Sequence, residues 1–200
     1  MANTMSARQR AKAFCDRFAL QIPILQAPMA GACPASLAIA VAKAGGMGGM
    51  GGLMTSPDGI RAWAIEVRAS TNGAFQINLW VPDPPPVRDA AAEARVRDFL
   101  GQFGPAVPEE AGNAALQDFA RQCEAMLDAG APVVSSIMGV FPDAFVARLK
   151  ERGVAWFATV TTLAEAQAAQ RAGADALIVQ GTEAGGHRGA FDNAAAERQG

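Results

Sequence analysis

The chain has few of the side chains from which metal and disulfide sites are built. Its 200 residues include one histidine and three cysteines, Cys15, Cys33 and Cys123, which lie far apart. An odd number of widely spaced cysteines indicates neither a disulfide framework nor a zinc ribbon. A single histidine leaves too few ligands for a transition-metal site. We therefore expect no metal and no disulfide.

The chain also lacks a large excess of charge of either sign. The 17 basic and 19 acidic residues give a net charge of −2, which is too close to neutral for a nucleic-acid-binding surface. Half of the residues are apolar, which is enough to drive collapse and excludes a disordered chain. The composition predicts one soluble globular domain.

An uninterrupted apolar span is missing too. No charged residue occurs from Phe18 to Ala42, but Pro23, Pro28 and Pro34 break any helix that would cross a membrane. Glutamines and prolines also interrupt the apolar core that a secretory signal requires. We expect no membrane partner and a cytoplasmic location, with which unpaired cysteines agree.

Short apolar runs alternate with helical patterns along the chain. Strands are expected at 22–27, 46–53, 75–80, 133–138, 154–160 and 176–180, with helices between them. Thr162 and Glu165 have the spacing of a capping box at the start of the last of these helices. Because the strands are continuously apolar, they favour a parallel sheet covered on both faces, and the fold class is α/β.

The number of strand–helix units leaves two architectures open. Six units can be counted, whereas a closed (β/α)₈ barrel needs eight. The chain is either an open six-stranded sheet or a barrel without its last quarter. We treat 1–200 as one domain, with the proline-rich stretch 82–112 as an insertion that holds a short helix near 90–100.

Two glycine-rich segments stand out. Gly46–Gly51 matches G-x-G-x-x-G, but a helix precedes it and the next helix begins only near Pro57, which is the wrong context for dinucleotide binding. These glycines are expected to form a strand against whose backbone something flat can lie. The loop Gln180–Gly189 follows a strand and contains His187, the side chain best suited to proton transfer near neutral pH.

Four runs of residues together resemble the nitronate monooxygenases, formerly called 2-nitropropane dioxygenases. They are Pro23–Gly31, Ala44–Gly48, Asn78–Trp80 and Gln180–Gly189. The resemblance implies an FMN-dependent TIM (β/α)₈-type barrel, which here would stop after about six β/α units. It also implies oxidation of alkyl nitronates by O₂ to a carbonyl compound and nitrite.

The resemblance also implies roles for individual residues. His187 would be the catalytic base or the positive partner of the nitronate. The expected FMN-binding residues are Pro28 and Met29 beside the isoalloxazine, Asn78 and Gln180 through hydrogen bonds, and Gly185 and Gly186 in the glycine-rich loop. The substrates would be a small nitronate and O₂, and a homodimer stays open as the assembly.

The family continues through strands seven and eight, whose loops hold the FMN phosphate. We therefore expect the 200-residue chain alone to bind FMN poorly or to be a fragment of a longer enzyme. Two rival functions remain: an FMN-dependent enoyl-acyl-carrier-protein reductase, which has a similar glycine–histidine loop, and a non-catalytic fragment of such an enzyme.

Overall fold

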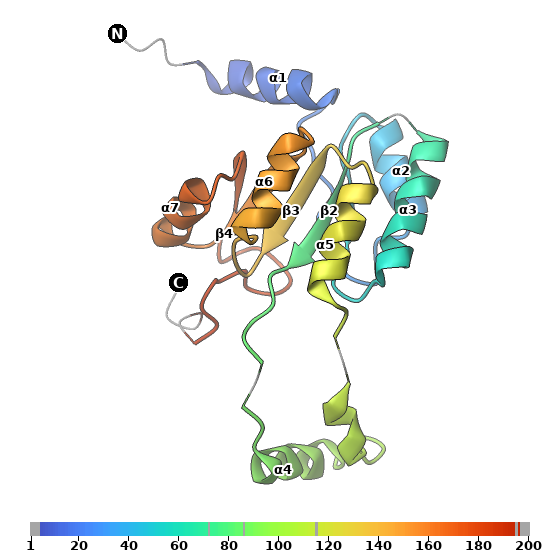
Figure 1. The fold of residues 1–200 in the computed structure, drawn as a ribbon, viewed down its shortest axis with the longest axis vertical. Coiled ribbons are helices and arrows are strands. Elements are labelled where there is room, and N and C mark those ends of the chain that lie inside the picture. Colours follow the sequence, from blue (N-terminus) through green and yellow to red (C-terminus); the bar gives the residue numbers. More distant parts are fainter. Residues whose placement is uncertain (1–4, 72, 86, 115, 195, 197–200) are drawn as a thin grey trace. The chain divides into compact units, whose positions relative to one another are not determined.

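Helices and strands alternate along the chain in a computed structural model (Figure 1). The structure describes residues 5–71, 73–85, 87–114, 116–194 and 196. It divides into two compact units, Met1–Pro82 with Asp118–Gly200, and Asp83–Gln117. The smaller unit overlaps the expected insertion at 82–112. A single flavin-binding domain over 1–200 stays a prediction.

The larger unit is built on a parallel sheet whose strands follow one another in sequence order. The strands are β1 (Gly48–Gly51), β2 (Phe75–Trp80), β3 (Val133–Ile137), β4 (Ala155–Val160) and β5 (Ala176–Val179). Each strand pairs in parallel with the next, and helices connect them. Five of the six predicted strands and the α/β class are confirmed.

The predicted first strand, 22–27, is wrong as a regular strand. This segment makes two isolated parallel bridges to the β1 region, Leu25 with Met47 and Ala30 with Gly51. Pro23 and Pro28 lack the N–H that a continuous ladder requires, so the pairing is interrupted. The segment nevertheless runs alongside β1 and occupies the position of a sixth strand.

Five helices of the larger unit pack on the outer face of the sheet. They are α2 (Ala35–Lys43), α3 (Pro57–Ser70), α5 (Phe119–Asp128), α6 (Asp143–Glu151) and α7 (Leu163–Arg171). Their apolar side chains share one core with alternate residues of the strands, such as Ile77, Val134 and Trp156. The predicted capping box at Thr162 and Glu165 is confirmed. Asp118 caps α5 by accepting from the Arg121 amide at 3.0 Å.

Helix α1 (Ala7–Phe18) was not predicted. Ser6 and Gln9 form a capping box at its start, which is the sequence signal that could have revealed it. Phe18 lies edge-on to Phe157 of β4, with ring centroids 5.3 Å apart. Its core also includes Met47, Ala74, Val133 and Ala155, which lie at the beginnings of four strands. Helix α1 therefore covers the amino-terminal ends of the strands.

The glycines of β1 were expected to let something flat lie against the strand, but they make room for other segments of the protein's own backbone. A Cβ on Gly49 would lie 2.7 Å from the carbonyl oxygen of Gln26, and one on Gly51 would lie 2.6 Å from the amide nitrogen of Ala30. A Cβ on Gly48 would similarly meet the carbonyl oxygen of Ala38 in α2 at 2.6 Å. The backbone at Gln26, Ala30 and Ala38 therefore lies against this strand.

The smaller unit contains α4 (Ala90–Leu100) and the 3₁₀ helix η1 (Glu109–Asn113). Asp89 caps α4 through the amides of Ala91 and Ala92. Arg88 pairs with Glu93 and also donates to the carbonyl oxygen of Gly112, at 2.9 Å, so it connects α4 with η1. The helix predicted near 90–100 is confirmed.

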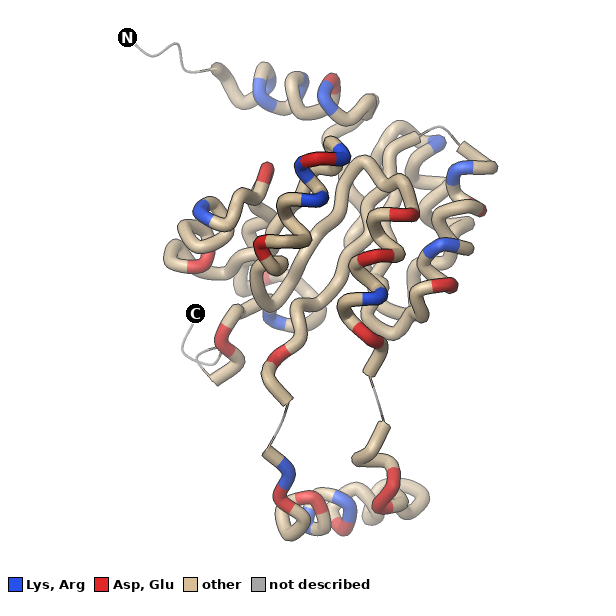
Figure 2. The backbone as a smooth tube through the Cα atoms, in the orientation of Figure 1, with Lys and Arg blue, Asp and Glu red and all other residues tan. Residues whose placement is uncertain are grey.

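Charges of both signs are interspersed along the outer helices (Figure 2). Some of these charged side chains form ion pairs between neighbouring helices. Arg61 of α3 pairs with Asp128 of α5 at 2.9 Å, and Arg148 of α6 pairs with Glu124 of α5. Such exposed pairs each contribute little stability. The packed apolar face therefore stabilises these helices more than their charges do.

Gly49→Ala is expected to destabilise the larger unit by about 1–3 kcal/mol, because the new methyl group overlaps the backbone of Gln26. The free energy of unfolding in urea measures the effect. Gly104→Ala is the matched control, since a Cβ there meets nothing within 4 Å. Equal stability of the two variants would contradict the close approach described for β1.

Asp175 should make stability depend on pH. Burial raises the pKa of its carboxyl, but hydrogen bonds from Lys150 and from the Trp156 amide outweigh burial and lower the pKa below its ordinary value of 3.8. A lowered pKa in the folded state means stabilisation above the ordinary pKa, which is lost as the pH falls through the folded value.

Asp175→Asn should therefore cost about 1 kcal/mol at pH 7, and the gap to wild type should close in acid. Urea unfolding at a series of pH values checks this. Asp16→Asn, at the exposed pair with Lys12, is the control and should change stability little. A gap that stays constant down to pH 2 would show that the Asp175 ion pair is not its source.

Candidate active site

The carboxyl-terminal edge of the sheet gathers most of the residues singled out in the sequence. In the paired register, Gly51 of β1 is opposite Asn78 of β2, which is opposite Ser135 of β3. Ala30 bridges Gly51 on the other side, so the turn at Pro28 and Met29 leaves the sheet at this same edge. Parallel pairing puts every strand's carboxyl end together, which is where ligands bind in such folds.

Gln26 holds the turn that carries Pro28 and Met29. Its side-chain amide accepts from the amide of Gly49 at 3.1 Å and donates to the Gly49 carbonyl at 3.0 Å. The same amide donates to the sulfur of Cys33, which also accepts from the Met29 amide, both at 3.2 Å. The turn is thus tied to β1, while the Met29 side chain is exposed.

Asn78 is buried in the middle of the edge. Its Nδ2 donates to the Ser135 hydroxyl at 3.0 Å. Gln76, two residues earlier on the same face of β2, donates to the Gln26 carbonyl at 3.1 Å. The Gln76 Oε1 is buried and has no hydrogen-bond partner among the described residues. Polar side chains therefore replace apolar ones on this face of β2.

Gln180 organises the loop that follows β5. Its Nε2 donates to the carbonyl oxygen of His187 at 2.9 Å, and its Oε1 accepts from the Gly189 amide at 2.6 Å. Gly186, which directly precedes His187, has a φ of +83°, which favours glycine. One side chain thus closes the base of the loop and presents residues 181–188 outward.

The His187 ring packs against the indole of Trp80. The ring centroids are 4.8 Å apart and the planes meet at 70°, an edge-to-face arrangement that is favourable for aromatic pairs. Trp80 ends β2, whereas His187 belongs to the loop after β5, so the contact spans the ends of β3 and β4. The structure therefore brings the two most distinctive sequence runs together at one point.

Glu165 anchors the other end of this loop. Its buried carboxylate accepts from the amide and the hydroxyl of Thr161, at 2.6 and 2.8 Å, and from the Phe191 amide at 2.9 Å. The sequence identified Glu165 only as a helix cap. Its second partner lies 26 residues away, and no local pattern indicates it.

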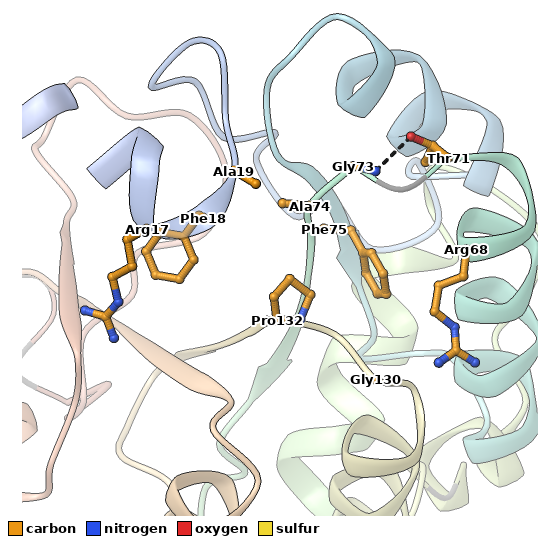
Figure 3. Close-up of a pocket in the computed structure, with 10 residues that line it drawn as sticks. All are labelled: Arg17, Phe18, Ala19, Arg68, Thr71, Gly73, Ala74, Phe75, Gly130 and Pro132. Carbon is orange, nitrogen blue, oxygen red and sulfur yellow. Dashed lines mark hydrogen bonds between the residues drawn. The ribbon is translucent and has the colours of Figure 1, made fainter. Parts of the chain in front are cut away.

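Two cavities of the larger unit lie at opposite edges of its sheet. One, of about 540 Å³, is lined mainly by the loop at 180–188, His187 included. The other, of about 490 Å³, lies at the amino-terminal edge among Arg17, Phe18, Arg68, Phe75 and Pro132 (Figure 3). Only the first contains predicted site residues, so we place the candidate site at the carboxyl-terminal edge.

The space beside the backbone of Gly185 and Gly186 is open, because a Cβ added to either residue would have no atom within 4 Å. A ligand can therefore approach their backbone directly. No group of three or more potential metal ligands occurs in the described part of the chain. No helix there combines the length and apolar character needed to cross a membrane.

The parallel α/β fold and the site at the carboxyl-terminal edge of its sheet together define a protein of the (β/α)₈-barrel type. A family model described as nitronate monooxygenase matches residues 12–200, and the chain belongs to this family. The nitronate monooxygenase of Paraburkholderia phytofirmans is 38% identical over 177 residues, which cover 85% of this chain and 48% of that protein. That of Pseudomonas aeruginosa is 34% identical over 186 residues, covering 88% and 53%.

Two solved structures are also similar to this chain in fold and sequence. A nitroalkane oxidase from Streptomyces ansochromogenes superposes with a TM-score of 0.76 at 34% identity, covering 90% of this chain and 52% of that one. FabK from Thermotoga maritima superposes with a TM-score of 0.64 at 27% identity, covering 93% and 47%. The predicted fold class and family are confirmed, and the chain spans about half the length of these relatives.

Glu165→Gln should loosen the loop at 180–191. A glutamine places an NH₂ group against amides that now donate to the carboxylate, which leaves buried donors unpaired and should cost about 2 kcal/mol. Urea unfolding and hydrogen exchange at the Phe191 amide measure the effect. Glu151→Gln, at the end of α6, is the control, and an unchanged exchange rate at Phe191 in Glu165→Gln would refute the anchor.

Proposed function

We propose that the protein is a flavoenzyme that oxidises alkyl nitronates with O₂ to a carbonyl compound and nitrite, with FMN as cofactor. The observation that carries this proposal is the position of the His187 ring. It is held against Trp80 at the edge where the turn at Pro28–Met29 and the buried Asn78 also lie. Family membership supports the reaction class.

The residues at this edge suit the flavin ring. Met29 offers an exposed apolar surface next to a turn that Gln26 and Cys33 hold in place. Asn78 offers a buried amide, and Gly185 and Gly186 offer open backbone. Pro28, Met29, Asn78, Gln180, Gly185 and Gly186 are accordingly the proposed FMN-binding residues. FMN, when bound, supplies the electron-transfer chemistry.

Gln180 has a structural task at this site as well. Both polar atoms of its amide are engaged within the loop, with the His187 carbonyl and the Gly189 amide. A hydrogen bond from Nε2 to the cofactor would therefore be shared with the His187 carbonyl or would replace it. Through the same bonds, Gln180 sets the position of the His187 backbone.

His187 is proposed to bind and orient the substrate. Its protonated ring would pair with the anionic nitronate, and its neutral ring would accept a proton from the carbon of a neutral nitroalkane. The edge-to-face contact with Trp80 orients the ring at this edge of the sheet. An oriented imidazole is what separates this loop from an ordinary flexible one.

His187→Asn should lower nitronate-dependent oxygen uptake by about a hundredfold or more, since an amide can neither carry the positive charge nor accept the proton. The assay uses the 200-residue chain with FMN in excess and the nitronate of nitroethane as substrate. Arg171→Gln, on the exposed end of α7, is the control and should keep wild-type uptake.

Other outcomes distinguish the rival functions. NADH oxidation with an enoyl thioester, and no uptake with the nitronate, would favour the FMN-dependent enoyl-acyl-carrier-protein reductase. FMN that passes straight through a desalting column, with no oxygen uptake, would favour a non-catalytic chain. Full activity in His187→Asn would remove His187 from the mechanism.

A further inference from the structure

Gln122 carries a set of hydrogen bonds that its helix does not require. It lies in α5 and is only 3% exposed. Its Nε2 lies 3.0 Å from the carbonyl oxygen of Gly52, 2.8 Å from that of Thr55 and 3.3 Å from that of Leu53. An amide NH₂ has two hydrogens, so the three carbonyls share two donors. One buried side chain thus binds three backbone carbonyls of the loop at 52–55.

This loop, residues 52–55, leaves β1 at the carboxyl-terminal edge and leads into α3. The amide of Gly52 donates to the carbonyl oxygen of Asn78 at 2.9 Å. Gly51, one residue earlier, approaches the turn on its other side, because a Cβ there would lie 2.8 Å from the carbonyl carbon of Met29. The backbone at 51–52 therefore touches both Asn78 and Met29.

The loop depends on Gln122 for its shape. Within the loop, the Thr55 amide donates to the Gly52 carbonyl at 2.9 Å, which closes a tight turn. Gly52 is buried, and the side chains of Leu79 and Ile60 lie within 4 Å of where its Cβ would be. A carbonyl in such apolar surroundings is costly to leave without a donor. Without Gln122, the Gly52 carbonyl would keep only the Thr55 amide and the Leu53 and Thr55 carbonyls would lose this donor, so the loop would rearrange to find others.

We infer that Gln122 is a positioning residue for the flavin site. It holds loop 52–55 by its carbonyls, and the loop in turn sets the spacing between Met29 and Asn78. The inference rests on the proposed function, because these two residues are the proposed floor and polar contact of FMN. Gln122 itself lies in α5, and its side-chain hydrogen bonds go to the loop carbonyls.

Gln122→Met tests this role, because methionine has a similar volume and no donor. We expect the FMN dissociation constant to rise about tenfold, since the carbonyls of Leu53 and Thr55 lose the Gln122 donor and that of Gly52 keeps only the Thr55 amide. Hydrogen exchange should become faster at the amides of Gly52 and Thr55. Cys123→Ala is the matched control: it is the next buried residue of α5, and it should lower the melting temperature without changing FMN affinity.

Gln122→Glu gives a second, independent readout, which also serves if Gln122→Met does not fold. Its carboxylate would face three carbonyl oxygens, whereas its protonated form restores one O–H donor. Burial raises the pKa of such a carboxyl. The FMN affinity of this variant should therefore increase from pH 8 to pH 5.5 relative to wild type and Cys123→Ala. A role confined to overall stability would instead shift the melting temperature with pH and leave the FMN affinity of the folded protein constant.

The outcomes separate this inference from the proposed function. Wild-type FMN binding that weakens in Gln122→Met, but not in Cys123→Ala, supports the positioning role. Unchanged FMN affinity in folded Gln122→Met overturns the inference and leaves the proposed function intact. A wild-type chain that does not bind FMN in excess overturns the proposed function, and this role with it.

Discussion

The parallel hydrogen-bond register of β1 to β5 is the constraint on which the candidate site depends, because it brings the carboxyl end of every strand to one edge. Asn78 and Trp80 of β2 and Gln180 after β5 come from two segments far apart in the chain, which share only that position. A shift of one residue in any strand would turn its site residue from the inner to the outer face of the sheet. The glycines of β1 belong to this constraint, since only they allow the segment at 24–30 to lie backbone to backbone against the strand.

The side-chain amides of three glutamines, two of them buried, then fix the segments that the register brings together. Gln26 binds both polar backbone atoms of Gly49, Gln122 binds the loop after β1, and Gln180 closes the loop that carries His187. An amide carries a donor and an acceptor and remains neutral, so it can satisfy backbone groups inside the protein without the cost of a buried charge. Glu165 is the charged exception, and it is surrounded by donors.

Much of the fold could be predicted because it depends on local chemistry. The apolar runs at 75–80 and 154–160 mark strands closely, and the capping box at Thr162 marks the start of α7. The prediction was wrong at 22–27, where prolines interrupt the ladder, and it missed α1, whose apolar residues are few and whose partners lie in distant strands. His187 was singled out from its glycine-rich loop, whereas the family resemblance supplied the flavin and its contacts, Asn78 among them; these roles stay proposals.

The sequence by itself determined the α/β class, the family and the glycine–histidine loop, because each follows from residues that are neighbours in the chain. Only the tertiary structure decided that His187 lies against Trp80, that Glu165 holds Phe191 and that Gln122 gathers the carbonyls of loop 52–55. These partners are 107, 26 and about 70 residues apart, and a side-chain amide or ring has no preference for a distant partner until the sheet has placed both. The physical reason is that register and packing, which are collective properties of the whole sheet, select those contacts.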